Sequence, residues 1–258
     1  MSFCKDCISG VTHEGEPTGK FEEINGVKTY VALPSTDYPK DKAILFLTDV
    51  YGLSLVNNLL LADDFAKNGF QTYAPDYLNG DPITVLDGTF DIGTWFKTHG
   101  PEHTRPTLDK VVAGLKERGI KVFGATGYCF GARYVFDLAF DNEIKAAVVS
   151  HPSLLQAPED LEKFKLTGVP LLINSCETDS QYPAEKQKIG DDILGGGKPE
   201  AENYKRAYFP GCTHGFAVRG DLSIPEVKAG KEGAFKNAIE WFIKKLSNVN
   251  IVIPKSRI

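Results

Sequence analysis

One cysteine lies between two glycines in the pentapeptide Gly127-Tyr128-Cys129-Phe130-Gly131. The G-x-C-x-G spacing is typical of a nucleophile elbow, a sharp turn between a strand and a helix that exposes the nucleophile. A short apolar run, Lys121 to Thr126, precedes the motif, and Ala132 to Phe140 is predicted to be helical. The positive end of that helix would favour the thiolate of Cys129. An inert core thiol is the alternative, because free cysteines are often buried.

An acid and a histidine follow the cysteine in the chain order that an α/β-hydrolase uses. The apolar run Val169 to Cys176 is predicted to be a strand, with Asp179 in the loop just past its carboxyl end. Tyr204 to Phe209 alternates as a final strand, and the glycine-rich loop after it carries His214. In such a triad His214 takes the thiol proton and later protonates the leaving group, while Asp179 orients the imidazole.

Both partners have rivals. Glu177 or Asp191 could replace Asp179, which could itself be a simple turn residue. Three of the other four histidines come before the nucleophile and so have the wrong chain order: His13, His99 and His103. His151 follows the predicted strand Ala146 to Ser150 and is expected to line the pocket or contact substrate, with a structural role as the alternative.

An oxyanion hole needs two backbone donors. One is predicted to be the N–H of Phe130, directly after the nucleophile, and the other to follow an early strand. Ala43 to Thr48 is that strand, which makes the N–H of Val50 the second candidate.

The sequence resembles the dienelactone hydrolase family, cysteine-dependent members of the α/β-hydrolase fold, and more closely its fungal branch. The resemblance spans most of the chain and is carried by Cys4 and Cys7 to Gly19, Thr48-Asp49-Val50-Tyr51-Gly52, Pro75-Asp76, the Cys129 motif, His151-Pro152-Ser153 and Thr213 to Asp221. It implies hydrolysis of enol-lactones such as carboxymethylene-butenolides, or of related small esters and lactones, with no cofactor. Residues expected to activate the thiol or bind substrate are Asp49, Tyr51, His151, Arg219 and Trp95.

Two positions depart from the bacterial pattern of that family. The resemblance puts a glutamate that activates the thiol at the position of Asp49, whose side chain is one methylene shorter. It also implies two arginines that hold a substrate carboxylate. Arg219 matches one with an offset of one residue, and Arg105 or Arg133 is the candidate for the other. An anionic dienelactone and a neutral or larger lactone are therefore both admissible substrates.

The remaining elements predict one α/β-hydrolase domain over residues 1–258: a single doubly wound, mostly parallel sheet with helices on both faces. Asn25-Gly26 predicts a hairpin turn between two edge strands. Helices are expected over residues 55–67, 107–118 and 225–246. Between them, residues 78–105 read as an irregular stretch whose aromatic side chains, Trp95 among them, could cap the pocket or simply pack.

Composition limits the partners. With 258 residues and 42% hydrophobic content the chain can bury one substantial core. A net charge of −5 without a basic run argues against nucleic acid and anionic membranes. The sequence contains no apolar stretch long enough to span a bilayer and no signal-peptide core, and its five cysteines suit a reducing compartment. We therefore expect a cytoplasmic monomer or homodimer acting on a small molecule.

The two ends of the chain carry weaker signals. The C-terminal tail, residues 247–258, ends in Ser256-Arg257-Ile258, which resembles a peroxisomal address and makes that compartment the alternative. Within the irregular N-terminal segment, residues 1–20, Cys4 and Cys7 with His13 resemble half a zinc site. No second ligand pair follows at the usual spacing, so a surface tail with two thiols and no metal site is expected.

Three functions fit these residues. The first is a cysteine-dependent hydrolase of lactones or esters, which the complete triad favours. The second is a non-catalytic member that binds or senses a small molecule in the same pocket. The third uses the same nucleophile for acyl transfer or C–C cleavage in secondary metabolism.

Overall fold

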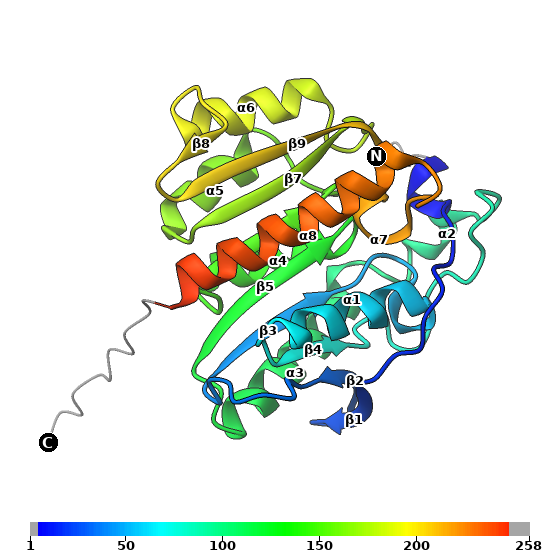
Figure 1. The fold of residues 1–258 in the computed structure, drawn as a ribbon, viewed down its shortest axis with the longest axis vertical. Coiled ribbons are helices and arrows are strands. Elements are labelled where there is room, and N and C mark those ends of the chain that lie inside the picture. Colours follow the sequence, from blue (N-terminus) through cyan, green and yellow to red (C-terminus); the bar gives the residue numbers. More distant parts are fainter. Residues whose placement is uncertain (1–4, 248–258) are drawn as a thin grey trace, which may run out of the picture.

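A single mixed sheet organises the chain in the computed structural model, which describes residues 5–247 (Figure 1). Its strands follow the order β1-β2-β4-β3-β5-β6-β7-β9-β8, and neighbours from β4 to β9 run parallel. The strands are β1 Lys20–Ile24, β2 Val27–Ala32, β3 Lys42–Leu47, β4 Thr72–Pro75, β5 Val122–Tyr128, β6 Ala146–Ser150, β7 Leu171–Thr178, β8 Glu200–Ala201 and β9 Tyr204–Thr213. The predicted α/β-hydrolase fold is confirmed.

Helices cover both faces of the sheet. Figure 1 shows α1 and α8 crossing in front of it, while α4 contacts β5 and β6 and packs with α5, which in turn packs with α6. The helices are η1 Lys5–Ile8, η2 Gly52–Ser54, α1 Val56–Lys67, α2 Ile92–Trp95, α3 Pro101–Glu117, α4 Gly131–Phe140, α5 Glu159–Thr167, α6 Ala184–Gly195, α7 Phe216–Arg219 and α8 Pro225–Leu246. Because both faces are covered, the central strands are buried and mostly apolar, as in the run Ile44 to Leu47 of β3.

The edge hairpin follows from its turn residues. Asn25 and Gly26 have φ angles of 49° and 75°. A two-residue type I′ turn needs positive φ at both positions, which glycine and asparagine adopt at low cost. The predicted hairpin is therefore confirmed, and β2 joins it to the parallel strands through antiparallel pairing with β4.

The segment before the nucleophile is more helical than expected. The helix α3 begins at Pro101 rather than near Thr107, and α2 lies inside the stretch expected to be irregular. Proline at the first helical position and Glu102 in the first turn are ordinary start signals. The sequence reasoning missed these start signals because an internal proline, here Pro106, usually marks a helix boundary.

The last long strand also extends further than expected. β9 continues through Pro210 and Gly211, which the sequence assigned to a loop, and Thr213 still pairs with Thr178 of β7. A register shift between Cys176 and Thr178 keeps the two strands paired through this irregularity. The consequence is that β7 and β9 end side by side, at the edge of the sheet where a parallel fold collects its functional groups.

The N-terminal segment is not a surface tail over its described part. Cys7 and Ile8 are buried, and Gly10 and Gly88 form backbone hydrogen bonds that join this segment to the loop after β4. The expectation of a surface thiol is therefore wrong for Cys7. Tertiary contacts with distant residues bury this segment, and its local apolar character does not account for the burial. Cys4 and the C-terminal tripeptide lie outside the described residues. No helix within residues 5–247 is long and apolar enough to cross a membrane.

Candidate active site

The turn that carries Cys129 has the geometry of a nucleophile elbow. Cys129 has a φ of 51°, in the left-handed region, between the end of β5 and the start of α4. A Cβ on Gly127 would lie 2.6 Å from the carbonyl oxygen of Gly131, and one on Gly131 would overlap the carbonyl oxygen of Leu47. Both glycines are thus required for this close approach of backbones. The turn leaves Cys129 at the carboxyl end of the sheet.

His214 and Asp179 meet at the adjacent end of β7 and β9. The Nδ1 atom of His214 lies 2.9 Å from Oδ1 of Asp179, and both side chains are buried. The same oxygen accepts backbone hydrogen bonds from Gln181 and Tyr182, at 2.8 and 3.1 Å. The backbone N–H of His214 donates to the carbonyl of Thr178 at 3.1 Å. These bonds fix both the carboxylate and the ring, and leave Nε2 of His214 to face the cysteine.

The rival acids have other partners. The Oε2 atom of Glu177 accepts the backbone N–H of Gly211 at 2.7 Å, on the exposed side of the strand. Asp191 pairs with Arg206 at 2.6 Å and accepts the hydroxyl of Tyr204. Of the three acids considered, Asp179 is therefore the one that contacts His214.

The rival histidines lie elsewhere, with one exception. His13 Nε2 lies 2.9 Å from the carbonyl oxygen of Gly220, His99 stacks on Trp95, and His103 is exposed in α3. His151 is fully buried with its ring 5.0 Å from that of His214. Neither of its ring nitrogens has a hydrogen-bond partner within residues 5–247. Burial, together with the charges of His214 and Arg219, lowers the pKa of His151 well below its usual value. The neutral form of the His151 side chain is therefore favoured where it lines the site.

Ser153 is a site residue that the sequence reasoning missed. Its Oγ lies 3.3 Å from Sγ of Cys129 and 3.4 Å from Nε2 of His214. The backbone N–H of Ser153 also donates to the carbonyl of Cys129 at 3.0 Å. One signal was present: Ser153 follows β6, whose Ser150 pairs with Tyr128 just before the nucleophile. Ends of neighbouring parallel strands converge, so a hydroxyl there was a candidate.

The electrostatics favour a charged cysteine–histidine pair. A hydrogen bond with Cys7 and the charge of His214 together lower the pKa of Cys129 well below that of an ordinary thiol, against the opposing effect of burial. Burial opposes charge on His214 too, but the carboxylate of Asp179 and the sulfur of Cys129 outweigh it and raise the pKa of His214 well above its usual value. Both shifts favour the charged forms, a thiolate on Cys129 and an imidazolium on His214.

A buried ion pair lies beside the nucleophile. The guanidinium of Arg219 contacts Oδ2 of Asp49 at 2.5 Å, with 1% and 0% of the two side chains exposed. Asn58 and the backbone N–H of Tyr51 donate to the other oxygen of Asp49, and the ring of Tyr51 lies 5.4 Å from the guanidinium carbon. Burial raises the pKa of Asp49, and the charge of Arg219 opposes that rise. Arg219 and Asp49, both expected at the substrate site, thus bind each other.

The other arginines considered for substrate binding are also paired. Arg105 contacts Asp109 and Asp141, each at 2.7 Å. Arg133 contacts Asp137 at 2.7 Å and Asp160 at 2.5 Å. Both guanidinium groups are therefore paired with carboxylates of the protein, and Arg133 also lines a cavity.

The candidate oxyanion donors lie at the ends of adjacent strands. Phe130 begins the turn into α4, and Val50 is buried in the loop after β3, the strand that pairs with β5. Trp95 packs edge-on against Phe130 at 5.6 Å and donates its indole N–H to the carbonyl of Asp81 at 2.9 Å. Beside Phe130 lies a cavity of about 540 Å³. Its lining combines the aromatic side chains of Phe96, Phe130, Tyr134 and Phe140 with the charged ones of Arg133, Asp137, Asp160 and Lys163.

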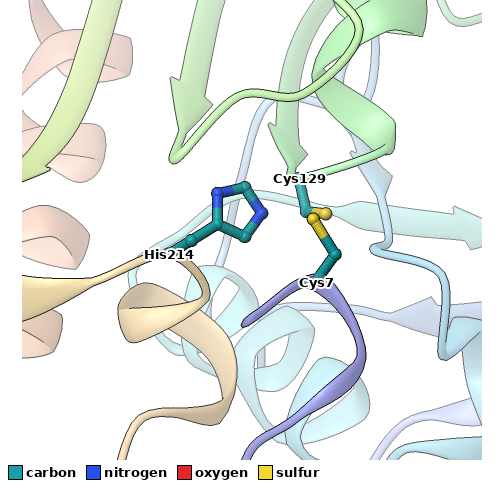
Figure 2. A group of neighbouring side chains, drawn as sticks. All are labelled: Cys7, Cys129 and His214. Carbon is teal, nitrogen blue, oxygen red and sulfur yellow. The ribbon is translucent and has the colours of Figure 1, made fainter. Parts of the chain in front are cut away.

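Cys7 is the second residue that the sequence reasoning missed. Figure 2 shows its sulfur next to that of Cys129, with the ring of His214 facing the two sulfurs. Arg219 holds the segment there by donating to the carbonyl oxygens of Ser9 and Cys7, at 2.9 and 3.2 Å. A cavity of about 280 Å³ between this segment and α7 is lined by both His214 and Arg219. No spacing rule would have placed a thiol from residue 7 at this site, because its neighbours come from distant parts of the chain.

Comparison with known proteins identifies the family of the chain. The profile of the "Dienelactone hydrolase family" matches residues 27–246. The chain is 35% identical to Hydrolase pyvD of Aspergillus violaceofuscus, over 92% of this chain and 94% of the relative. It is 32% identical to Dienlactone hydrolase 1 of Gibberella moniliformis, over 91% of each chain. A solved dienelactone hydrolase from Anabaena variabilis superposes with a TM-score of 0.60 at 15% identity, over 90% of this chain and 99% of that one. With the elbow, the strand order and a profile match over most of its length, the chain belongs to the dienelactone hydrolase family.

Proposed function

We propose that this protein hydrolyses small lactones and carboxylic esters through a covalent thioester on Cys129. The observation that carries the proposal is the contact of His214 with Asp179, which turns the free ring nitrogen toward the sulfur at the elbow. Membership of the dienelactone hydrolase family supports a hydrolase of lactones or esters. A binding protein has no need for three such groups in this arrangement.

The first half-reaction forms the thioester. The thiolate of Cys129 attacks the carbonyl carbon of the substrate, and the carbonyl oxygen takes up negative charge between the N–H groups of Phe130 and Val50. The C–O bond then breaks, and the imidazolium of His214 gives its Nε2 proton to the departing oxygen. In a lactone this opens the ring, and the new hydroxyl stays attached to the acyl chain.

The second half-reaction restores the enzyme. Neutral His214 removes a proton from water, whose oxygen attacks the thioester, and the carboxylic acid leaves as the thiolate of Cys129 is released. Asp179 stabilises the imidazolium in both steps without taking the proton. Oγ of Ser153 lies within 3.4 Å of both Sγ of Cys129 and Nε2 of His214, so it is in place to relay a proton between them.

The aromatic side chains that line part of the cavity beside Phe130 support an apolar acyl or ring portion in the substrate. A carboxylate on the substrate would have to compete with Asp49 for Arg219, because the ion pair occupies that guanidinium. A neutral lactone needs no such exchange. The charge of the substrate is therefore the property to vary first.

The test is a side-by-side assay of cis- and trans-dienelactone, neutral butenolides and p-nitrophenyl acetate. Wild type is compared with Cys129→Ala, His214→Ala and Cys212→Ala, the last a buried thiol outside the site. We expect turnover to vanish in Cys129→Ala, to fall at least about 10³-fold in His214→Ala, and to persist in Cys212→Ala. Turnover unchanged in Cys129→Ala would overturn the proposal, and products other than the free acid would indicate acyl transfer or C–C cleavage.

A further inference from the structure

Three metal-binding side chains converge at the nucleophile. The sulfurs of Cys7 and Cys129 and a ring nitrogen of His214 all lie within 4.8 Å of one another, and the residues are 4%, 1% and 3% exposed. Figure 2 shows them approaching one another from three segments of the chain. Within residues 5–247 they form the one group of three His, Cys, Asp or Glu side chains with this closeness. Two thiolates and an imidazole are the donor set that Zn²⁺ binds most readily.

The spacing suits a tetrahedral ion. With Zn–S near 2.3 Å and Zn–N near 2.0 Å, donors around one ion are roughly 3.5 to 3.8 Å apart, so small side-chain movements close the site. Oγ of Ser153 lies 3.3 Å from the sulfur of Cys129 and 3.4 Å from Nε2 of His214, so it is close to two of the three donors. A serine hydroxyl or a water held by it would complete the coordination.

The surrounding contacts orient these donors. Nδ1 of His214 is bound to Asp179, which leaves Nε2 for a metal, an arrangement common around protein-bound zinc. Cys7 is held by the hydrogen bond from Arg219 to its own carbonyl and by the bond from Gly88 to the carbonyl of Ile8, at 3.0 Å. Two thiolates and a neutral imidazole also balance the charge of a divalent ion, so the buried complex would be neutral.

We infer that Cys7, Cys129 and His214 form a Zn²⁺ site whose occupation blocks the proposed nucleophile. On binding, Zn²⁺ accepts a lone pair from each sulfur and from Nε2, and any protons on these atoms pass to solvent. Catalysis and metal binding then exclude each other, because the metal holds the thiolate that would attack the substrate. The ion is an inhibitor here, not a cofactor.

The direct test is Co²⁺ binding to chelator-treated wild type, Cys7→Ser and Cys212→Ser. We expect one Co²⁺ per chain in wild type, with sulfur-to-metal charge-transfer absorption and the strong visible bands of a tetrahedral ion. In Cys7→Ser the charge-transfer intensity should fall to about half, and the affinity for Zn²⁺, measured by competition with a chelator, should fall about 100-fold or more. Cys212→Ser should match wild type. Equal affinity in Cys7→Ser and wild type would overturn the inference.

A second measurement needs no variant. Wild type with and without Zn²⁺ is treated with N-ethylmaleimide, and each cysteine is quantified by mass spectrometry. Zn²⁺ should protect Cys7 and Cys129 together and leave the alkylation of Cys212 unchanged. Protection of Cys129 without Cys7 would refute the three-ligand site even if Cys7→Ser failed to fold.

Inhibition is the one part that rests on the proposed function. In the ester assay, the Zn²⁺ concentration that halves the rate should be at least about 100-fold higher for Cys7→Ser than for wild type, each relative to its own metal-free rate. The spectra require no substrate, so the two proposals fail separately. A tetrahedral Co²⁺ spectrum without any hydrolysis leaves the metal site and removes the function, and hydrolysis without metal binding does the reverse.

Discussion

Breaking the Asp49–Arg219 pair should cost far more stability than breaking an ion pair at the surface. At 2.5 Å the two charges attract by about 7 kcal/mol for an effective dielectric constant of about 20, and the loss of solvation offsets part of this. In Arg219→Met the apolar stem is kept while Asp49, which is 0% exposed, loses its countercharge. We expect the free energy of unfolding to fall by about 3 to 5 kcal/mol, measured by urea denaturation.

The matched control is Arg105→Met. Arg105 contacts two carboxylates, each at 2.7 Å, but the side chains of Asp109 and Asp141 are 52% and 56% exposed. Solvent screens that network, so its loss should cost about 1 kcal/mol or less. Adding Asp49→Asn to Arg219→Met removes the unpaired carboxylate of Asp49 and should recover part of the lost stability. If Arg219→Met costs no more than Arg105→Met, the buried pair does not stabilise the site and this reasoning is wrong.

Three further outcomes follow from the geometry of the site. Asp179→Asn should lower turnover of the best ester about 10³-fold or more, because the amide cannot stabilise an imidazolium; wild-type rates would contradict the proposed role. Gly131→Ala should lower the free energy of unfolding by about 3 kcal/mol, since its Cβ meets the carbonyl of Leu47. Gly69→Ala meets no atom but has a φ of 90°, so the backbone strain alone should cost about 1 kcal/mol; equal losses in urea denaturation would count against the close approach at Gly131. The depressed pKa of Cys129 keeps its thiolate present below the usual thiol range of about 8.5, so the rate of its alkylation by iodoacetamide, in chelator, should barely fall between pH 8 and pH 6; a fall of about 100-fold would show an ordinary thiol.

The sequence predicted those parts of the site whose placement depends on local patterns. Gly127 and Gly131 around Cys129 define the elbow because only glycine tolerates that backbone approach. Asp179 and His214 follow apolar strands, and the ends of parallel strands meet at one edge of the sheet. Local pattern was enough for these three residues, and for the order of the elements that carry them.

Other site residues depend on contacts that no local pattern encodes. Cys7 reaches the site because Arg219, far away in the chain, holds its carbonyl oxygen. Ser153 lies in a loop whose path is set by the bond from its N–H to the carbonyl of Cys129. The start of α3 was missed because Pro106 usually breaks a helix, whereas here the helix contains it.

The attachment of the N-terminal segment has a consequence for how the nucleophile is reached. The bond from Arg219 to Ser9 closes a chain loop of 210 residues, whereas the bond from His214 to Asp179 closes one of 35. Closing the longer loop from the unfolded chain costs about 1.6 kcal/mol more in free energy, because more chain entropy is lost. Hydrogen bonds made by Gly10, Gly88 and Arg219, together with the burial of Cys7 and Ile8, offset that cost. Because the segment around Cys7 makes fewer contacts with the fold than the strands of the sheet make with one another, we expect it to detach first. The nucleophile would then be exposed by a local opening that leaves the sheet intact.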